Sequence, residues 1–295
     1  MVKNFNRCFL TKTTFIPSIV LTLSFICFAV LTGNAQGNLL ISPKRLVFDG
    51  TKKTQEINLA NTGKDTAKYL ISVMEIRMTE FGGFEEITTP DSGQFFASKF
   101  LRFFPRTVTL APNESQVVKV QLIKTNELTE SEYRSHVYFR ANLDTKALGE
   151  KEETKDTSSI SVQLTPVFGI TIPIIIRNGV PNTQLKIGDC AIRYTPENTP
   201  VISMALYRSG NMSSYGDINV ELVNKEGKKI LVGMAKGVAV YTPNKLRRFQ
   251  FELNSTPGIN LHNAKLHITY AASVDQMAKG MTTPEVYAET DIVAP

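Results

Sequence analysis

The chain has 295 residues, of which 42% are hydrophobic and 20% are charged, with 18 Gly, 14 Pro and 3 Cys. These values lie close to the averages of soluble globular proteins, so they exclude collagen-like, disordered and disulfide-rich scaffolds. The length predicts two domains. The formal net charge of +6 falls to +3 without the basic N-terminal segment, leaving 30 basic against 27 acidic residues. This scattered remainder gives little reason to expect nucleic-acid binding.

The first 35 residues have the pattern of a secretory signal peptide. A positive segment at 3–12 precedes an apolar run, Ile19–Leu31, and the small residues Gly33–Ala35 suit a signal peptidase. The apolar run is shorter than the roughly 20 residues that a membrane-spanning helix needs. We therefore expect residues 1–35 to be removed, so that the mature chain starts at Gln36, is exported and has no integral membrane segment.

The first predicted domain covers residues 36–178 and consists of β-strands. Period-2 alternation of apolar and polar residues recurs there, with turn residues at 61–63, 81–83 and 111–113. Seven short strands over about 140 residues favour an antiparallel β-sandwich over alternating βα units. The predicted strands are Leu39–Phe48, Thr54–Leu59, Ala67–Met78, Arg106–Leu110, Gln116–Leu122, Tyr133–Asn142 and Ile160–Ile176.

A short linker at residues 179–182 separates this domain from a second one at 183–295. The second domain again shows strand patterns, so the fold class is all-β with two β-sandwich domains. The chain contains no Trp, and Cys190 is the single cysteine after the signal segment, so neither half has an antibody-type core. Cys190 has no disulfide partner, and we expect a buried, inert thiol. The predicted strands are Leu185–Tyr194, Val201–Tyr207, Asp217–Val223, Lys229–Tyr241, Leu246–Leu253, Lys265–Ala271 and Val286–Ile292.

The segment Ile160–Ile176 is the most informative part of the sequence. Every even-numbered position in it is apolar. Extended, it would reach about 55 Å, much longer than a typical strand. Pro166 and Pro173 cannot donate hydrogen bonds to a neighbouring strand, which favours an edge position, and an exposed edge can pair with a partner's incomplete sheet. The alternative is that the run folds back as two ordinary strands at Pro166. The preceding residues 144–159, mixed in charge, are predicted to form a flexible loop.

Three further segments resemble the periplasmic pilus (fimbrial) chaperones. Arg45–Gly50, shortly after Ser42-Pro43, is similar to their first-strand signature, and Pro105–Val120 is similar to a central strand, turn and strand. Glu132–Phe139 resembles the sixth strand of some branches. The resemblance covers residues of about 38 to 178. It implies two immunoglobulin-like domains arranged in an L, with the seventh strand of the first domain lending apolar side chains to a pilus subunit.

The resemblance also assigns residues to the binding of that subunit. Aligned on Arg177, the donor residues fall on the apolar face at Leu164, Pro166, Phe168 and Ile170, continued by Ile172. In the family an Arg and a Lys anchor the terminal carboxylate of the subunit between the domains. Arg45 matches the Arg, whose guanidinium can bind a carboxylate with two parallel hydrogen bonds.

The Lys position, however, falls on Pro173, so a second cation must come from elsewhere. Lys44 and Arg177 are the candidates for an auxiliary anchor. Alternatively, the subunit is held mainly by its backbone and apolar side chains. A different interpretation of Arg45 is a surface or linker-facing salt bridge, which would contribute little.

The resulting prediction is a periplasmic chaperone whose partners are secreted pilus subunits and an outer-membrane assembly platform. The alternative is a structural or adhesive component of a surface fibre, but such a subunit would carry its alternating segment as a free N-terminal arm, whereas here it is internal. A third class, a secreted enzyme or sugar-binding module, has little support. His136, His262 and His267 lack partners at metal-ligand spacing, and no nucleophile or phosphate-loop motif is present. We expect no catalysis, no metal and no cofactor.

Overall fold

The computed structural model describes residues 39–142, 167–254, 261–273 and 283–295. Almost all regular structure in these ranges is β-strand, apart from two single 3-10 turns, Ser98–Phe100 and Thr125–Glu127. The described ranges contain no helix long and apolar enough to cross a membrane. The predicted signal segment, the predicted loop at 144–159, and the donor candidates Leu164 and Pro166 lie outside the described residues. The predicted all-β fold class is confirmed.

The first domain is a sandwich of two sheets that bury a common core. Its largest fully buried side chains include Phe48, Phe100 and Phe139. One sheet has the order β1-β3-β9-β7 and the other β2-β11-β10-β4-β8. The strands are β1 (Leu39–Ser42), β2 (Leu46–Phe48), β3 (Thr54–Asn61), β4 (Ala67–Met74), β7 (Leu101–Phe104), β8 (Thr107–Leu110), β9 (Ser115–Leu122), β10 (Ser131–Ala141) and β11 (Gly169–Asn178).

Two predicted strands are each divided in the structure. The segment 39–48 forms β1, which pairs with β3, and β2, which pairs in parallel with β11 in the opposite sheet. Pro43 lies between them and cannot donate a ladder hydrogen bond, so the chain can change sheets there. The segment 67–78 divides into β4 and β5 (Ile76–Met78). Strand β7 was not predicted from the sequence.

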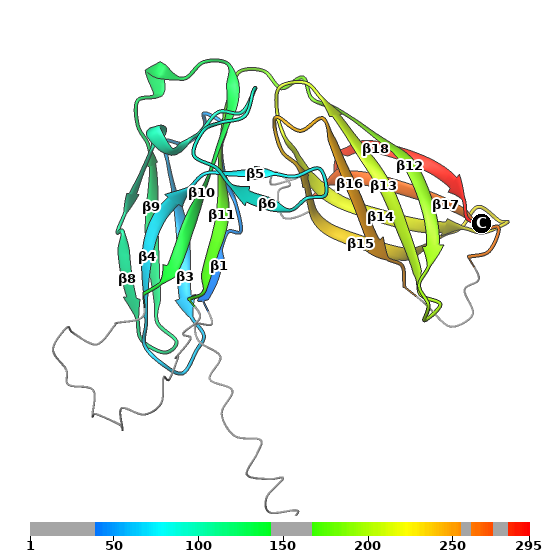
Figure 1. Ribbon diagram of the computed structural model, residues 1–295, viewed down its shortest axis with the longest axis horizontal. Coiled ribbons are helices and arrows are strands. Elements are labelled where there is room, and N and C mark those ends of the chain that lie inside the picture. Colours follow the sequence, from blue (N-terminus) through cyan, green and yellow to red (C-terminus); the bar gives the residue numbers. More distant parts are fainter. Residues whose placement is uncertain (1–38, 143–166, 255–260, 274–282) are drawn as a thin grey trace, which may run out of the picture.

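A hairpin of β5 and β6 (Phe84–Glu86) leaves the first domain and reaches the second (Figure 1). Hydrogen bonds from Arg248 and Asn244 attach it there. The backbone N–H of Arg248 donates to the carbonyl of Glu80 at 2.7 Å, and the side-chain amide of Asn244 donates to the carbonyl of Met78 at 2.8 Å. The hairpin is therefore a second physical connection between the domains, in addition to the linker.

The second domain is a smaller sandwich. Tyr270 lies in its core, and its hydroxyl donates to the carbonyl of Val238 at 2.8 Å. The two sandwiches meet at one end and at an angle, in an L-shaped arrangement (Figure 1). The sheets have the orders β12-β13-β16 and β15-β14-β17-β18. Their strands are β12 (Gln184–Tyr194), β13 (Pro200–Ser209), β14 (Ser214–Val223), β15 (Lys229–Val240), β16 (Leu246–Glu252), β17 (Lys265–Ala272) and β18 (Val286–Val293).

Cys190 lies at an irregularity in β12, where the pairing with β13 shifts between Gly188 and Ala191. Its side chain is half-buried, so it is less enclosed than the predicted buried thiol. Burial, followed by the nearby Asp189, raises the pKa of the thiol. A raised pKa lowers the thiolate fraction, and the thiolate is the reactive form.

Candidate functional site at the β11 edge and the domain junction

One edge of β11 is only partly covered. Along its whole length β11 pairs with β10, but on the other side β2 pairs with it only at Ile174–Ile176. From Gly169 to Pro173 this outer edge has no strand partner among the described residues. The first half of the strand therefore presents backbone groups that can pair with another chain.

The direction of the backbone groups follows from one hydrogen bond. The N–H of Ala141 donates to the carbonyl of Phe168 at 3.0 Å. Because antiparallel pairing alternates, the backbone groups of even-numbered residues in β11 point toward β10 and those of odd-numbered residues point outward. Gly169 and Thr171 thus offer both N–H and C=O to the open edge. Pro173 occupies an outward position, where its missing N–H breaks no bond of the sheet.

The described donor candidates have different environments. The residue-level exposed fraction is 56% for Phe168 and 39% for Ile170, so both present apolar surface beside the open edge. Ile172, which the resemblance placed with them, is only 4% exposed and packs in the core of its own domain. The opposing sheet already covers the side chain at this point, so we assign Ile172 to the core and not to the exposed binding edge.

A pocket of about 220 Å³ lies between the domains, where Thr171 and Pro173 at the end of the open edge of β11 line it. Its floor comes from the first domain. His136 faces Pro173 across the β10–β11 pair, and Arg45 directly precedes Leu46, which pairs with Ile174. Its other walls come from the second domain and from the β5–β6 hairpin. The aromatic lining residues are Phe84, Tyr215 and Tyr241.

Arg45 is buried in this pocket without a hydrogen-bond partner. The residue is 8% exposed, and none of the three guanidinium nitrogens makes a hydrogen bond. The guanidinium carbon lies 4.1 Å from the ring centroid of Tyr215, a cation–π distance. Burial lowers the pKa of Arg45, and the Tyr241 hydroxyl offsets part of this effect. The alternative interpretation, a surface or linker-facing salt bridge, does not fit, because Arg45 is buried and its guanidinium has no hydrogen-bonding carboxylate partner.

Arg134 and His136, from the same face of β10, extend this buried polar cluster. Arg134 lies with its guanidinium carbon 4.3 Å from the ring centroid of Tyr241, and its Nε and one terminal nitrogen have no hydrogen-bond partner. His136 is 3% exposed, and its Nδ1 also lacks a partner. Burial, followed by the charge of Arg134, lowers the pKa of His136 to about 3. His136 is therefore neutral at physiological pH.

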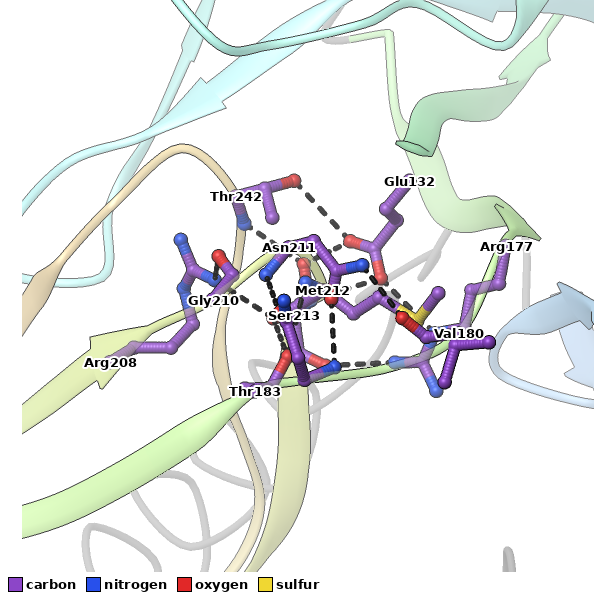
Figure 2. Close-up of polar contacts among 11 residues, drawn as sticks. Glu132, Arg177, Val180, Thr183, Arg208, Gly210, Asn211, Met212, Ser213 and Thr242 are labelled. Atoms are coloured by element: carbon purple, nitrogen blue, oxygen red, sulfur yellow. Dashed lines mark hydrogen bonds and ion pairs between the residues drawn. The ribbon is translucent and has the colours of Figure 1, made fainter. Parts of the chain in front are cut away.

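A hydrogen-bond network centred on Glu132 joins the two domains (Figure 2). Its carboxylate, 0% exposed, accepts bonds from the Arg177 Nε at 3.1 Å, the Ser213 N–H at 3.0 Å and the Thr242 hydroxyl at 3.3 Å. The Ser213 hydroxyl also donates to it, and accepts a bond from the Thr242 N–H at 2.9 Å. Arg177 donates to the Ser213 carbonyl at 2.8 Å as well.

The two auxiliary anchor candidates thus lie in different places. Arg177 is held by Glu132 and Ser213 in the network that joins the domains, so its guanidinium already has partners. Lys44 is exposed and lines the pocket beside Arg45. Of the two, Lys44 shares the pocket with Arg45.

The linker is attached to the second domain by a reciprocal pair of amides. The Asn182 N–H donates to the Asn211 side chain at 3.0 Å, and the Asn211 N–H donates to the Asn182 side chain at 2.9 Å. The Asn211 side-chain amide also donates to the Val180 carbonyl at 2.9 Å (Figure 2). The connection between the domains is therefore held by hydrogen bonds as well as being short.

Comparisons with known proteins give similarity of fold only. No family model and no curated protein matches the sequence. A Pseudomonas aeruginosa CupB2 chaperone structure is 11% identical, with a TM-score of 0.41, covering 87% of this chain and 100% of its own. A chain of the SafA pilin and SafB chaperone complex of Salmonella enterica is 11% identical, with a TM-score of 0.36, covering 86% and 95%.

A third match is a chain of the CsuC–CsuE complex of chaperone and tip subunit from Csu pili of Acinetobacter baumannii. It is 12% identical, with a TM-score of 0.37, covering 72% of this chain and 89% of its own. These proteins are of the class that the sequence motifs resemble. Similarity at this level carries no argument about function, which must rest on the residues of this chain.

Chemically, the described residues offer groups that suit binding. No group of three or more His, Cys, Asp or Glu in the described ranges could hold a metal ion. The open edge can accept an extended segment, and the neighbouring pocket offers unpaired cationic nitrogens to an anion. Sequence analysis identified Arg45 and missed Arg134. In the sequence, Arg134 was marked only by its place in the motif Glu132–Phe139, where the pattern indicates one residue of a polar strand face.

Proposed function

We propose that the protein is a periplasmic chaperone that binds pilus or fimbrial subunits by offering the open edge of β11 and that delivers them for surface assembly at an outer-membrane platform. One observation carries this proposal: the outer edge of β11 from Gly169 to Pro173 lacks a partner strand among the described residues, while Phe168 and Ile170 expose apolar side chains beside it. A sheet edge with this combination favours strand addition.

Arg45 supports the same proposal. A buried cation without a partner is costly to the free protein, because desolvation is not offset by hydrogen bonds. The terminal carboxylate of a bound subunit would supply the missing acceptor. Arg45 lies close to the open edge, because it directly precedes Leu46–Phe48, the segment that pairs with β11 at Ile174–Ile176. An extended subunit segment on the open edge could thus place its terminus at the pocket.

The test is mass spectrometry of the proteins that co-purify with the mature chain from periplasmic extract. The variant is Phe168→Asp combined with Ile170→Asp, which should lose the bound partner and keep the fold, because the lost contacts are intermolecular. The matched control is Val286→Asp combined with Val293→Asp, which changes two exposed apolar residues of β18.

We expect a dominant secreted partner with the unchanged chain and with the control, and its loss with the β11 variant. A partner that the β11 variant retains, with circular dichroism showing an intact fold, would contradict the assignment of this edge. The absence of any partner would favour a structural component of a surface fibre.

A further inference from the structure

A second guanidinium with an unpaired nitrogen lines the same pocket as Arg45. Arg247 lies on β16 of the second domain, and its Nε is buried without a hydrogen-bond partner. One terminal nitrogen donates to the carbonyl of Ala239. The guanidinium also lies against Gly82 of the β5–β6 hairpin, where an added Cβ would come within 2.6 Å of it. Backbone contacts thus hold Arg247 in place, and its buried Nε, which also lies against Gly82, makes no hydrogen bond.

We propose that Arg45 and Arg247 together hold one carboxylate, so that the anion-binding site is shared between the two domains. The inference rests on the proposed function, in which this carboxylate is the terminus of a bound subunit. It also explains how the site works with Pro173 where the resemblance expects a Lys. Pro173 brings no charge, and the second cation comes from the other domain.

Electrostatics favours an anion at this position. The pocket contains two guanidiniums with unpaired nitrogens, and the buried carboxylate of Glu132 already accepts four hydrogen bonds, from Arg177, Ser213 and Thr242. A carboxylate has about four lone-pair positions on two oxygens, so it can accept from two guanidiniums at once. The Nδ1 of neutral His136 on the pocket floor can add a further hydrogen bond in the tautomer that carries its proton there.

The remaining lining suits the end of a peptide chain. Tyr215, Tyr241 and Phe84 surround the cationic groups with aromatic surface. Aromatic walls exclude water, and a charge-assisted hydrogen bond is stronger where water is excluded. An apolar residue that ends in a free carboxylate matches this combination of apolar walls and cationic floor.

A site of this composition has a consequence for the domain junction. Both cations face the ligand only when the domains stand as they do in this structure, because Arg45 and Arg247 belong to different sandwiches. A bound carboxylate would therefore stabilise this arrangement, since a ligand stabilises the state to which it binds. Binding at the pocket and the relative position of the domains are coupled.

The experiment uses two small probes and arginine-selective NMR. The purified protein, labelled with ¹⁵N-arginine, is titrated with N-acetyl-leucine, which has a free carboxylate, and with N-acetyl-leucinamide, which does not. We expect the acid to shift the Nε–Hε signals of both Arg45 and Arg247, and the amide to shift neither. Signals are assigned with Arg45→Gln and Arg247→Gln.

The variants then test each contribution. Arg247→Gln should weaken binding of the acid about tenfold or more, the usual effect of losing a hydrogen bond to a charged group. Arg248→Gln is the matched control, because it removes the same charge from an exposed neighbouring residue, and it should change the affinity less than twofold. If Arg247→Gln does not fold, Arg247→Lys, which keeps the positive charge, supplies the assignment of the Arg247 signal, and the titration of the unchanged protein then decides the question.

Each outcome separates this inference from the proposed function. If only Arg45 responds and Arg247→Gln binds the acid normally, the shared site is wrong and the proposed function stands. If neither signal moves with up to 50 mM acid, the carboxylate site is wrong altogether. The β11 edge is judged independently, since Phe168→Asp with Ile170→Asp should lose the co-purifying partner but bind N-acetyl-leucine as before.

Discussion

Replacing Glu132 by Ala should destabilise the protein by about 3 to 5 kcal/mol, the usual cost of removing one partner of a buried ion pair. The Glu132 carboxylate is 0% exposed and accepts bonds from Arg177, Ser213 and Thr242. The substitution would leave the Ser213 N–H buried without an acceptor, at about 1 to 3 kcal/mol. Arg177 is 30% exposed, so water replaces part of what it loses and the total should fall nearer the lower limit.

Glu132→Gln should cost less, about 1 to 3 kcal/mol, because one oxygen remains and the Ser213 hydroxyl can rotate to accept a bond. Ser213→Ala should cost about 1 to 2 kcal/mol, since its hydroxyl both donates to Glu132 and accepts from Thr242. When Glu132→Gln and Ser213→Ala are combined, their effects on the free energy of unfolding should not add, because both changes act on one network.

The assay is urea unfolding, followed by tyrosine fluorescence, for which the chain has 9 Tyr, and by circular dichroism. Loss of the network should also separate the unfolding of the two domains, since Glu132 connects them. Glu127→Ala, an exposed residue nearby, is the control and should stay within about 0.5 kcal/mol of the unchanged protein. A loss below 1 kcal/mol for Glu132→Ala would refute the reasoning from burial and hydrogen bonding.

Other changes should have distinct effects. Arg45→Met should leave the free protein as stable as before or up to about 1 kcal/mol more stable, yet weaken the binding of a purified subunit by about 2 to 5 kcal/mol in calorimetry. His136 should make the protein about 2 kcal/mol less stable at pH 5 than at pH 7. In the unfolded chain His136 has a pKa near 6.5 and is protonated at pH 5, whereas in the folded protein its pKa is about 3 and it stays neutral. His136→Gln should remove this share of the pH dependence. Cys190 should react with a thiol reagent more slowly than in the urea-unfolded chain at the same pH, because its pKa is raised; equal rates would argue against this. Asn61→Ala should cost about 2 to 4 kcal/mol in urea unfolding, since its 1%-exposed side chain bonds to the carbonyls of Asp65 and Leu110 and to the N–H of Gly63.

Strand alternation made the sandwiches predictable, because the parity of side chains along a strand is a local property. It could not show what covers each face. Glu132, Arg134 and His136 are polar residues at alternate positions, a pattern that predicts a solvent-facing side, yet all three are buried at the junction with the second domain and the hairpin. Burial of this kind depends on how two domains pack, which no local pattern records.

The limits of the prediction on β11 have a similar cause. Every even-numbered position from Ile160 to Ile176 is apolar, but among the described positions 168–176 the core of the first domain includes only Ile172, Ile174 and Ile176. The exposed fraction falls from 39% at Ile170 to 4% at Ile172, although the alternation is the same at both positions. The sequence likewise pointed to Arg45 through a motif, whereas Arg247 lies 202 positions further along and no motif marks it.

The attachment of the domains at several separate points also bears on cleavage of the chain. Val180 is 81% exposed in the linker, so a protease would have access to the peptide chain there. A cut at this point would break the covalent connection but not the Glu132 network or the contacts of the hairpin with Asn244 and Arg248. The two fragments would therefore remain together as a non-covalent pair, and only a denaturing gel would reveal that the chain had been cut.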